Sequence, residues 1–101
     1  MSREYVDNKM DEAYEMIEQG AYIESIEKMR QLKIKCPSDI LKDIMEWEEK
    51  KDKQYSNKMQ EIESTNMHIF DKETKKLGTA KDYAWDYYKH YNKLIREYDV
   101  K

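Results

Sequence analysis

The chain has 101 residues, 41% of them charged and 39% hydrophobic, and this length allows one domain with a single small core. A mean hydropathy of −1.18 and the lack of any run of about 18 apolar residues predict no membrane-spanning helix. Two glycines and one proline cannot supply the turns of a β-sandwich, a β-barrel or a Rossmann fold, so we expect an all-α protein. The net charge of −3 is too balanced for a domain that neutralises nucleic-acid phosphates.

Cysteine usage and the N-terminal sequence predict a cytoplasmic protein. Cys36 is the only cysteine, so it cannot form an intramolecular disulfide. The first ten residues contain no apolar run typical of a signal peptide. The abundance of Lys, Ile, Tyr and Met beside few Ala and Gly resembles small proteins of AT-rich Firmicutes and their phages, which favours a phage or other mobile element as the source.

Two helices with a short connection are predicted for the first third of the chain. Ser2 is suited to cap a helix over residues 3–19, and Gly20 is suited to end it. One face of this helix carries apolar residues at spacings of three and four: Val6, Met10, Ala13 and Ile17. A second helix is predicted over residues 22–35, because Pro37 disfavours helical backbone at the residue before it. The short connection should make the two helices an antiparallel hairpin.

A third, longer helix is predicted over residues 39–63, with Ser38 as its cap. Its first half places three apolar residues on one side: Ile40, Ile44 and Trp47. Residues 48–54, EEKKDKQ, contain no apolar residue, so we expect the helix to leave the core and project there. Residues 67–70, MHIF, are expected to form an apolar connector, followed by a short helical turn over residues 71–77.

The fourth helix is predicted over residues 80–98, because Gly78 is suited to close the preceding turn and Thr79 to cap a new helix. At 100° per residue, one stripe of this helix collects mainly aromatic and apolar residues: Ala80, Ala84, Tyr87, Tyr88, Tyr91, Leu94, Ile95 and Tyr98. Trp85 is expected on the opposite, polar face, beside two cationic residues: Lys89 and Arg96.

The first third of the chain also carries an ordered pattern of small, large and turn residues. These are Ala13 and Met16, the connection Gln19-Gly20-Ala21-Tyr22, and then Ser25, Met29, Leu32 and Pro37. On this pattern, residues 6–37 resemble a single tetratricopeptide repeat, a helical hairpin whose first helix lines a peptide-binding groove in that family. The resemblance implies five groove residues: Asp7, Met10, Tyr14, Ile17 and Glu18. Residues 38–71 do not repeat the pattern, so a lone repeat would need other helices, or a second chain, to cover its faces.

No pattern in the sequence is typical of an enzyme or a metal centre. His68 and His90 lack the spacing and the neighbours of zinc ligands. Gly20 and Gly78 stand alone, so the chain has no glycine-rich loop for a nucleotide phosphate. We therefore expect no enzymatic activity, no cofactor and no bound metal.

The aromatic residues of the C-terminal segment indicate a binding function. Five of the nine tyrosines, together with Trp85, lie between residues 83 and 98. Tryptophan, tyrosine and arginine are enriched at the energetic hot spots of protein interfaces. We therefore predict a small adaptor or inhibitor that blocks a larger cytoplasmic protein, with contacts from Trp85, Lys89 and Arg96.

Two other classes of function stay open. A dimeric, nucleic-acid-associated regulator would use the tyrosines and lysines of residues 80–98. Alternatively, residues 38–63, with eight acidic and five basic side chains, would compete for the nucleic-acid-binding groove of another protein. A structural homo-oligomer would instead complete the sparse core with a second chain. Salt dependence separates phosphate binding from an apolar interface.

Overall fold

The computed structural model describes residues 3–33 and 38–96. Within these residues the chain is all-α, as the sequence predicts, with four α-helices and a closing π-helical turn. The elements are α1 (Arg3–Glu18), α2 (Tyr22–Lys33), α3 (Ser38–Ser64), α4 (Ile69–Tyr91) and η1 (Asn92–Arg96). The predicted bounds of the first and third helices differ from these by one residue or less at each end. The Ser2 cap, Cys36, Pro37 and the predicted helix ends at 35 and 98 lie outside the described residues.

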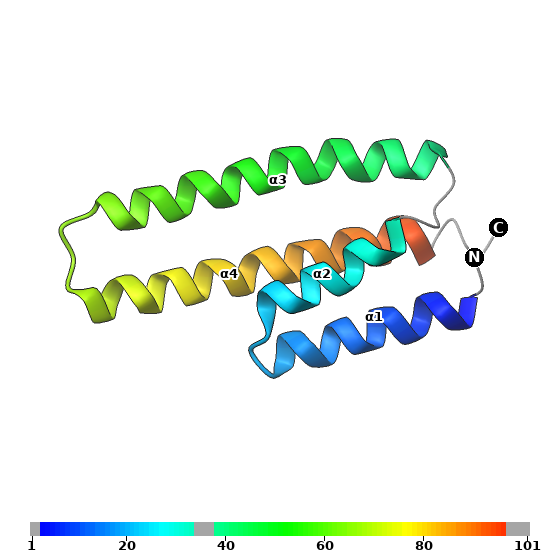
Figure 1. Cartoon of the computed structure of the whole chain (residues 1–101), viewed down its shortest axis with the longest axis horizontal. Helices are drawn as coiled ribbons and strands as arrows, with labels where there is room; N and C mark the ends of the chain where they lie inside the picture. Colours follow the sequence, from blue (N-terminus) through cyan, green and yellow to red (C-terminus); the bar gives the residue numbers. More distant parts are fainter. Residues whose placement is uncertain (1–2, 34–37, 97–101) are drawn as a thin grey trace.

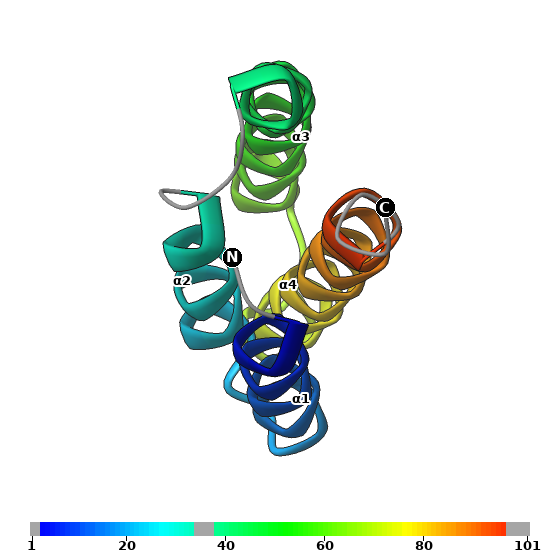
Figure 2. The ribbon, with the colours of Figure 1, turned by 90° about the vertical axis from the view of Figure 1, so that its right-hand side faces the viewer.

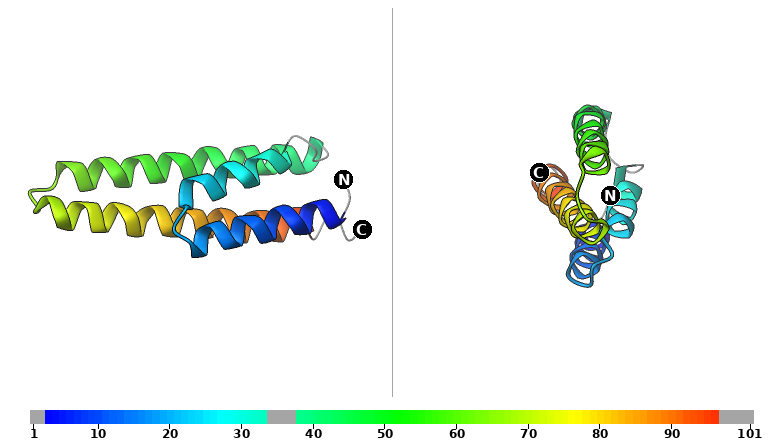
Figure 3. Two further views of the ribbon diagram at one scale, coloured as in Figure 1. Left: turned by 60° about the horizontal axis from the view of Figure 1, so that its bottom comes forward. Right: turned by 90° about the vertical axis from the view of Figure 1, so that its left-hand side faces the viewer.

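Two antiparallel helical hairpins of unequal length build the molecule (Figure 1). The shorter hairpin is α1–α2, and its turn lies about midway along α4, whereas the α3–α4 turn lies at the far end of the molecule (Figures 1 and 3). Seen end-on, the helices lie around one common centre (Figure 2). Because the longer hairpin extends past the shorter one, the molecule is elongated, with extents of 50 × 27 × 17 Å.

Gly20 ends α1 through local backbone geometry. Its φ of 88° lies in the left-handed region that favours glycine. The Gly20 N–H donates to the carbonyl of Ile17 at 3.0 Å, and the Ala21 N–H donates to that of Met16 at 2.8 Å. These two bonds form a Schellman motif, which reverses the chain in very few residues and so brings α2 back along α1.

Replacing each glycine with alanine should give opposite changes in stability. Gly20→Ala should lower the free energy of unfolding by about 1 kcal/mol, because an L side chain is strained at this φ. Gly78→Ala should raise it by about 0.5–1 kcal/mol, because Gly78 lies inside α4 and an added Cβ there meets no atom within 4 Å. Urea denaturation followed by circular dichroism measures both changes. If both substitutions changed the free energy of unfolding in the same direction, the different backbone roles of Gly20 and Gly78 would be contradicted.

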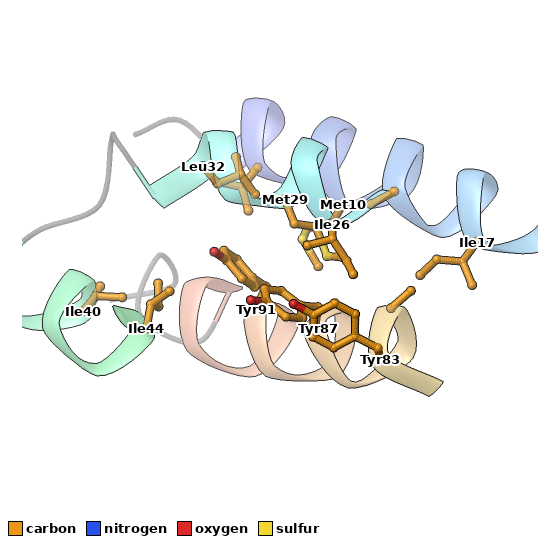
Figure 4. Packing of buried hydrophobic residues seen from close by; sticks show 13 residues of the cluster. Met10, Ile17, Ile26, Met29, Leu32, Ile40, Ile44, Tyr83, Tyr87 and Tyr91 are labelled. Carbon is orange, nitrogen blue, oxygen red and sulfur yellow. The ribbon is translucent and has the colours of Figure 1, made fainter. Parts of the chain in front are cut away.

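The core lies between the two hairpins and is closed by the tyrosines of α4 (Figure 4). Its most deeply buried side chains come from all four helices: Val6, Met10, Ala13, Ile26, Met29, Leu32, Ile44, Ala84, Tyr87 and Tyr91. Tyr87 stacks on Tyr91 at a centroid distance of 5.9 Å and meets Trp47 edge-on at 5.0 Å. The predicted stripe of the fourth helix is therefore the main contribution of α4 to the core.

The predicted break before the fourth helix is wrong, because α4 begins at Ile69 and runs without interruption through Gly78 and Thr79. The residue that caps α4 is His68, whose Nδ1 accepts a hydrogen bond from the Phe70 N–H at 3.2 Å. One glycine inside a helix costs only about 1 kcal/mol, and contacts with α3 offset that cost. The Lys72 ammonium donates to the Glu63 carbonyl, and that of Lys76 pairs with the Glu63 carboxylate.

The prediction that α3 leaves the core at residues 48–54 is also wrong. Glu48 is buried, with 5% of its surface exposed, and Asp52 is half-buried. Both carboxylates bind Arg30 of α2, and Tyr83 and Tyr87 of α4 bind Asp52. Glu48 and Asp52 thus face polar groups of α2 and α4, whereas four other residues of the segment are exposed: Glu49, Lys50, Lys53 and Gln54. What projects beyond the α1–α2 turn is the paired end of α3 and α4 (Figure 1).

Candidate protein-binding surface

The structure divides the eight predicted partner-binding residues into groups with different surroundings. Three of them gather on one surface of α1 and α4: Tyr14, Glu18 and Trp85. Two are core residues, 0% and 2% exposed: Met10 and Ile17. Asp7 is half-buried on α1, and Lys89 is exposed one helical turn after Trp85. The Arg96 side chain lies outside the described part of the chain.

A three-ring aromatic cluster joins α1 to α4. Tyr14 of α1 meets Trp85 of α4 at a centroid distance of 5.4 Å with an interplanar angle of 72°. Tyr88 completes the cluster, 5.7 Å from Tyr14 and 5.8 Å from Trp85. Edge-on contacts of this kind stabilise aromatic pairs beyond their area burial. Tyr14 is 42% exposed, so the cluster forms part of the molecular surface.

The polar edge of this aromatic cluster is acidic. The charge of Glu18, one turn further along α1, and a hydrogen bond between the two side chains raise the pKa of the Tyr14 hydroxyl above its ordinary value. The Tyr14 hydroxyl therefore stays protonated near neutral pH and holds the Glu18 carboxylate beside the ring. The surface thus combines an apolar centre with a hydroxyl, a carboxylate and the neighbouring Lys89.

The surroundings of Trp85 correct one expectation from the sequence. The indole does not lie isolated on a polar face, because it is half-buried and packs against the core through Tyr14 and Tyr88. The start of α4 at Ile69 lies about 24 Å away along the helix at 1.5 Å per residue, so Trp85 does not contact the apolar residues there. Helical periodicity places Trp85 on α4 but carries no information about the position of α1.

The groove role that the tetratricopeptide resemblance implies for Met10 and Ile17 is contradicted by their burial. Both side chains face the core (Figure 4), where α2 and α4 cover the apolar face of α1. Only Tyr14 and Glu18 of the implied set contribute to the aromatic surface, and they do so from the edge of α1.

A second cluster, which the sequence did not predict, is a polar network centred on Arg30. Its Nε lies 3.2 Å from Glu48 Oε2, and its Nη2 lies 3.2 Å from Asp52 Oδ2 and 3.1 Å from the Tyr87 hydroxyl. The Tyr87 hydroxyl donates to Asp52 Oδ1 at 2.6 Å, and the Tyr83 hydroxyl donates to the same oxygen. One side chain of α2, Arg30, therefore links α3 to α4 within the polar segment of residues 48–54.

The electrostatics of this network favour a structural role. Burial, reinforced by the Asp52 contact, raises the pKa of Tyr83 to about 12 and that of Tyr87 further. For Arg30, burial acts to lower the pKa, but the Tyr87 hydroxyl and the Asp52 charge outweigh it and raise the pKa overall. Both hydroxyls stay protonated and the guanidinium stays charged near neutral pH, so the network fastens α2 between the other helices.

Another aromatic contact explains the position of His90. Its imidazole stacks on Trp47 of α3 with a centroid distance of 4.0 Å and an interplanar angle of 7°. Burial, and to a lesser degree Lys93, lowers the pKa of His90 below its ordinary value. The neutral imidazole is therefore a packing group between α3 and α4.

The most exposed apolar side chains lie at the free end of the α3–α4 hairpin. Ile69 and Phe70 are each 71% exposed and Leu77 is 59% exposed. The sequence predicts residues 67–70, MHIF, as a connector, but Ile69 and Phe70 are the first two residues of α4. Within the described residues, α1 and α2 end before they reach this surface (Figure 3).

No group of three His, Cys, Asp or Glu side chains in residues 3–33 and 38–96 is placed to hold a metal ion. In the same part of the chain, no helix is long and apolar enough to cross a membrane. No family model matches the chain, and no curated protein or solved structure matches it either.

Proposed function

We propose that this protein is a non-enzymatic interaction module, an adaptor or inhibitor that occupies a surface of a larger cytoplasmic protein. The observation that carries the proposal is the partly exposed aromatic cluster of Tyr14, Trp85 and Tyr88, which two helices hold in place. It is supported by the neighbouring Glu18 and Lys89, which supply both signs of charge at its rim.

The geometry of the cluster suits an energetic hot spot. Tyrosine and tryptophan present a large amphipathic surface with few rotatable bonds, so ordering them on binding costs little entropy. The mutual packing of the three rings already restricts their rotamers, which reduces that cost further. A partner would cover the exposed edge of Tyr14 and leave the half-buried Trp85 as the rigid base.

Affinity capture with the tagged protein from a nuclease-treated bacterial lysate, followed by binding measurements with the purified partner, tests the proposal. Tyr14→Ala should weaken the captured interaction at least about tenfold, because it removes the exposed ring of the cluster. Met45→Ala is the matched control, since Met45 is 55% exposed on α3, away from the cluster. This variant should bind the partner with the affinity of the wild type. Circular dichroism checks that both variants stay folded.

Two results would contradict the proposal. The first is equal affinity of the wild type and Tyr14→Ala for every captured protein. The second is capture that requires intact nucleic acid and weakens steeply with added salt, since this behaviour indicates phosphate contacts and favours a nucleic-acid-associated regulator.

A further inference from the structure

One line of residues along α4 changes from covered to uncovered partway along the helix. Phe70, Leu77, Ala84 and Tyr88 follow one another at spacings of seven, seven and four, which keeps them within about 20° of one direction on the helix. Ala84 is fully buried and Tyr88 packs against Tyr14, so this direction faces the α1–α2 hairpin. Phe70 and Leu77 point the same way but are 71% and 59% exposed. The face of α4 that carries α1 therefore continues without a covering helix among the described residues.

The neighbouring groove between α3 and α4 is open over the same stretch. Past the α1–α2 turn, an open groove of about 640 Å³ is lined mainly by α3, between Asp52 and Ser64, with Lys76 from α4. Asp52, at one end of this groove, also binds Arg30 of α2. The groove therefore continues the surface of α3 that the Arg30 side chain contacts.

We propose that this uncovered face of the α3–α4 hairpin is the interface of a two-fold symmetric homodimer, in which the α4 helices of two copies cross antiparallel at Leu77. Each copy then covers Phe70 and Leu77 of the other, the two side chains of this face that its own α1–α2 hairpin does not reach. The interface is self-complementary, because the surface that is exposed and the surface that covers it are the same.

Charge complementarity supports a second copy of the chain as the occupant. Glu73 lies four residues before Leu77 and Lys81 four residues after it, and both are exposed. Each is offset by only about 40° from Leu77 around the helix, on opposite sides. An antiparallel pair centred on Leu77 therefore places Glu73 of each copy against Lys81 of the other, which gives two equivalent opposite-charge contacts. A parallel pair would instead place like charges together.

The size of the apolar patch predicts a weak dimer. Phe70 and Leu77 together expose on the order of 300 Å² of mainly apolar surface, and patches of a few hundred Å² often mark interaction sites. A stable interface buries about 800 Å² on each partner, so the polar rim of the groove must contribute the rest. We therefore expect association in the micromolar range.

Sedimentation equilibrium of the full chain, from low to high micromolar concentration, tests the dimer, and charge reversal tests its geometry. Glu73→Lys or Lys81→Glu alone should raise the dissociation constant about tenfold or more, because each places two pairs of like charges in contact. The double variant Glu73→Lys with Lys81→Glu should restore dimerisation, because it exchanges the charges within each contact. Glu49→Lys, the same charge change at an exposed position of α3, should leave the dissociation constant unchanged.

A monomer at every concentration would overturn the proposal and leave the face to a different occupant. A dimer that neither single reversal weakens, or that the double variant fails to restore, would overturn the antiparallel arrangement about Leu77. All variant positions are exposed, and circular dichroism separates loss of association from loss of folding. Tyr14→Ala should leave the dimer intact, so this result is independent of the proposed partner surface.

Discussion

Replacing Arg30 with alanine is expected to lower the free energy of unfolding by about 2–4 kcal/mol. The substitution removes the Arg30 guanidinium from the Glu48 carboxylate, whose side chain is 6% exposed, and it removes the contact between α2 and Asp52. Removing one partner of a buried ion pair costs more than the pair contributes, because desolvation of the remaining carboxylate is then offset less. Urea denaturation monitored by circular dichroism measures the loss.

Two comparisons isolate the pairing in this experiment. Lys53→Ala removes a cation from an exposed position of the same polar segment and should change stability by about 0.5 kcal/mol or less. Arg30→Met combined with Glu48→Met should recover much of the stability that Arg30→Met alone loses, because the buried carboxylate is removed together with its guanidinium partner. If Arg30→Ala behaves like Lys53→Ala, the network does not hold α2 in place.

Tyr87→Ala is expected to be the most damaging single substitution, with a loss of about 3–5 kcal/mol. Tyr87 is fully buried and contacts rings on both sides, Trp47 of α3 and Tyr91 of its own helix. Truncation removes this packing and leaves a cavity in a core that supplies only the marginal stability of a small domain. Thermal and urea denaturation both report the loss.

Conservative and peripheral replacements divide the effect of Tyr87 into its parts. Tyr87→Phe keeps the ring and removes only the hydroxyl that donates to Asp52, so a loss of about 1–2 kcal/mol is expected. Tyr14→Ala, at a partly exposed position outside the network, should cost about 1 kcal/mol or less. A loss for Tyr87→Ala no larger than that for Tyr87→Phe would show that the ring contributes little to the core.

Features that depend on neighbours along the chain were predictable from the sequence. The scarcity of glycine and proline predicted the all-α class, and Gly20 predicted the end of α1, because a positive φ at that position is a local property. The spacing of Tyr87 and Tyr91 predicted the buried stripe of α4, since helical periodicity alone places residues on a common face. Local rules were less decisive at Gly78, where the cost of a glycine inside a helix is small enough for contacts with α3 to overcome.

Only the tertiary structure decided which surfaces meet. The sequence predicts that Glu48 and Asp52 face solvent, yet both bind groups of other helices. Arg30, which binds Glu48, is 18 residues away from it in the chain, and the tyrosine hydroxyls that bind Asp52 come from α4. The length of the α1–α2 hairpin sets how far it covers α4 (Figure 1). For this reason Trp85 packs against Tyr14, whereas Phe70 and Leu77 are exposed. Periodicity assigns a residue to a face of its own helix, whereas pairing between distant helices determines whether that face is buried, charged or open to a partner.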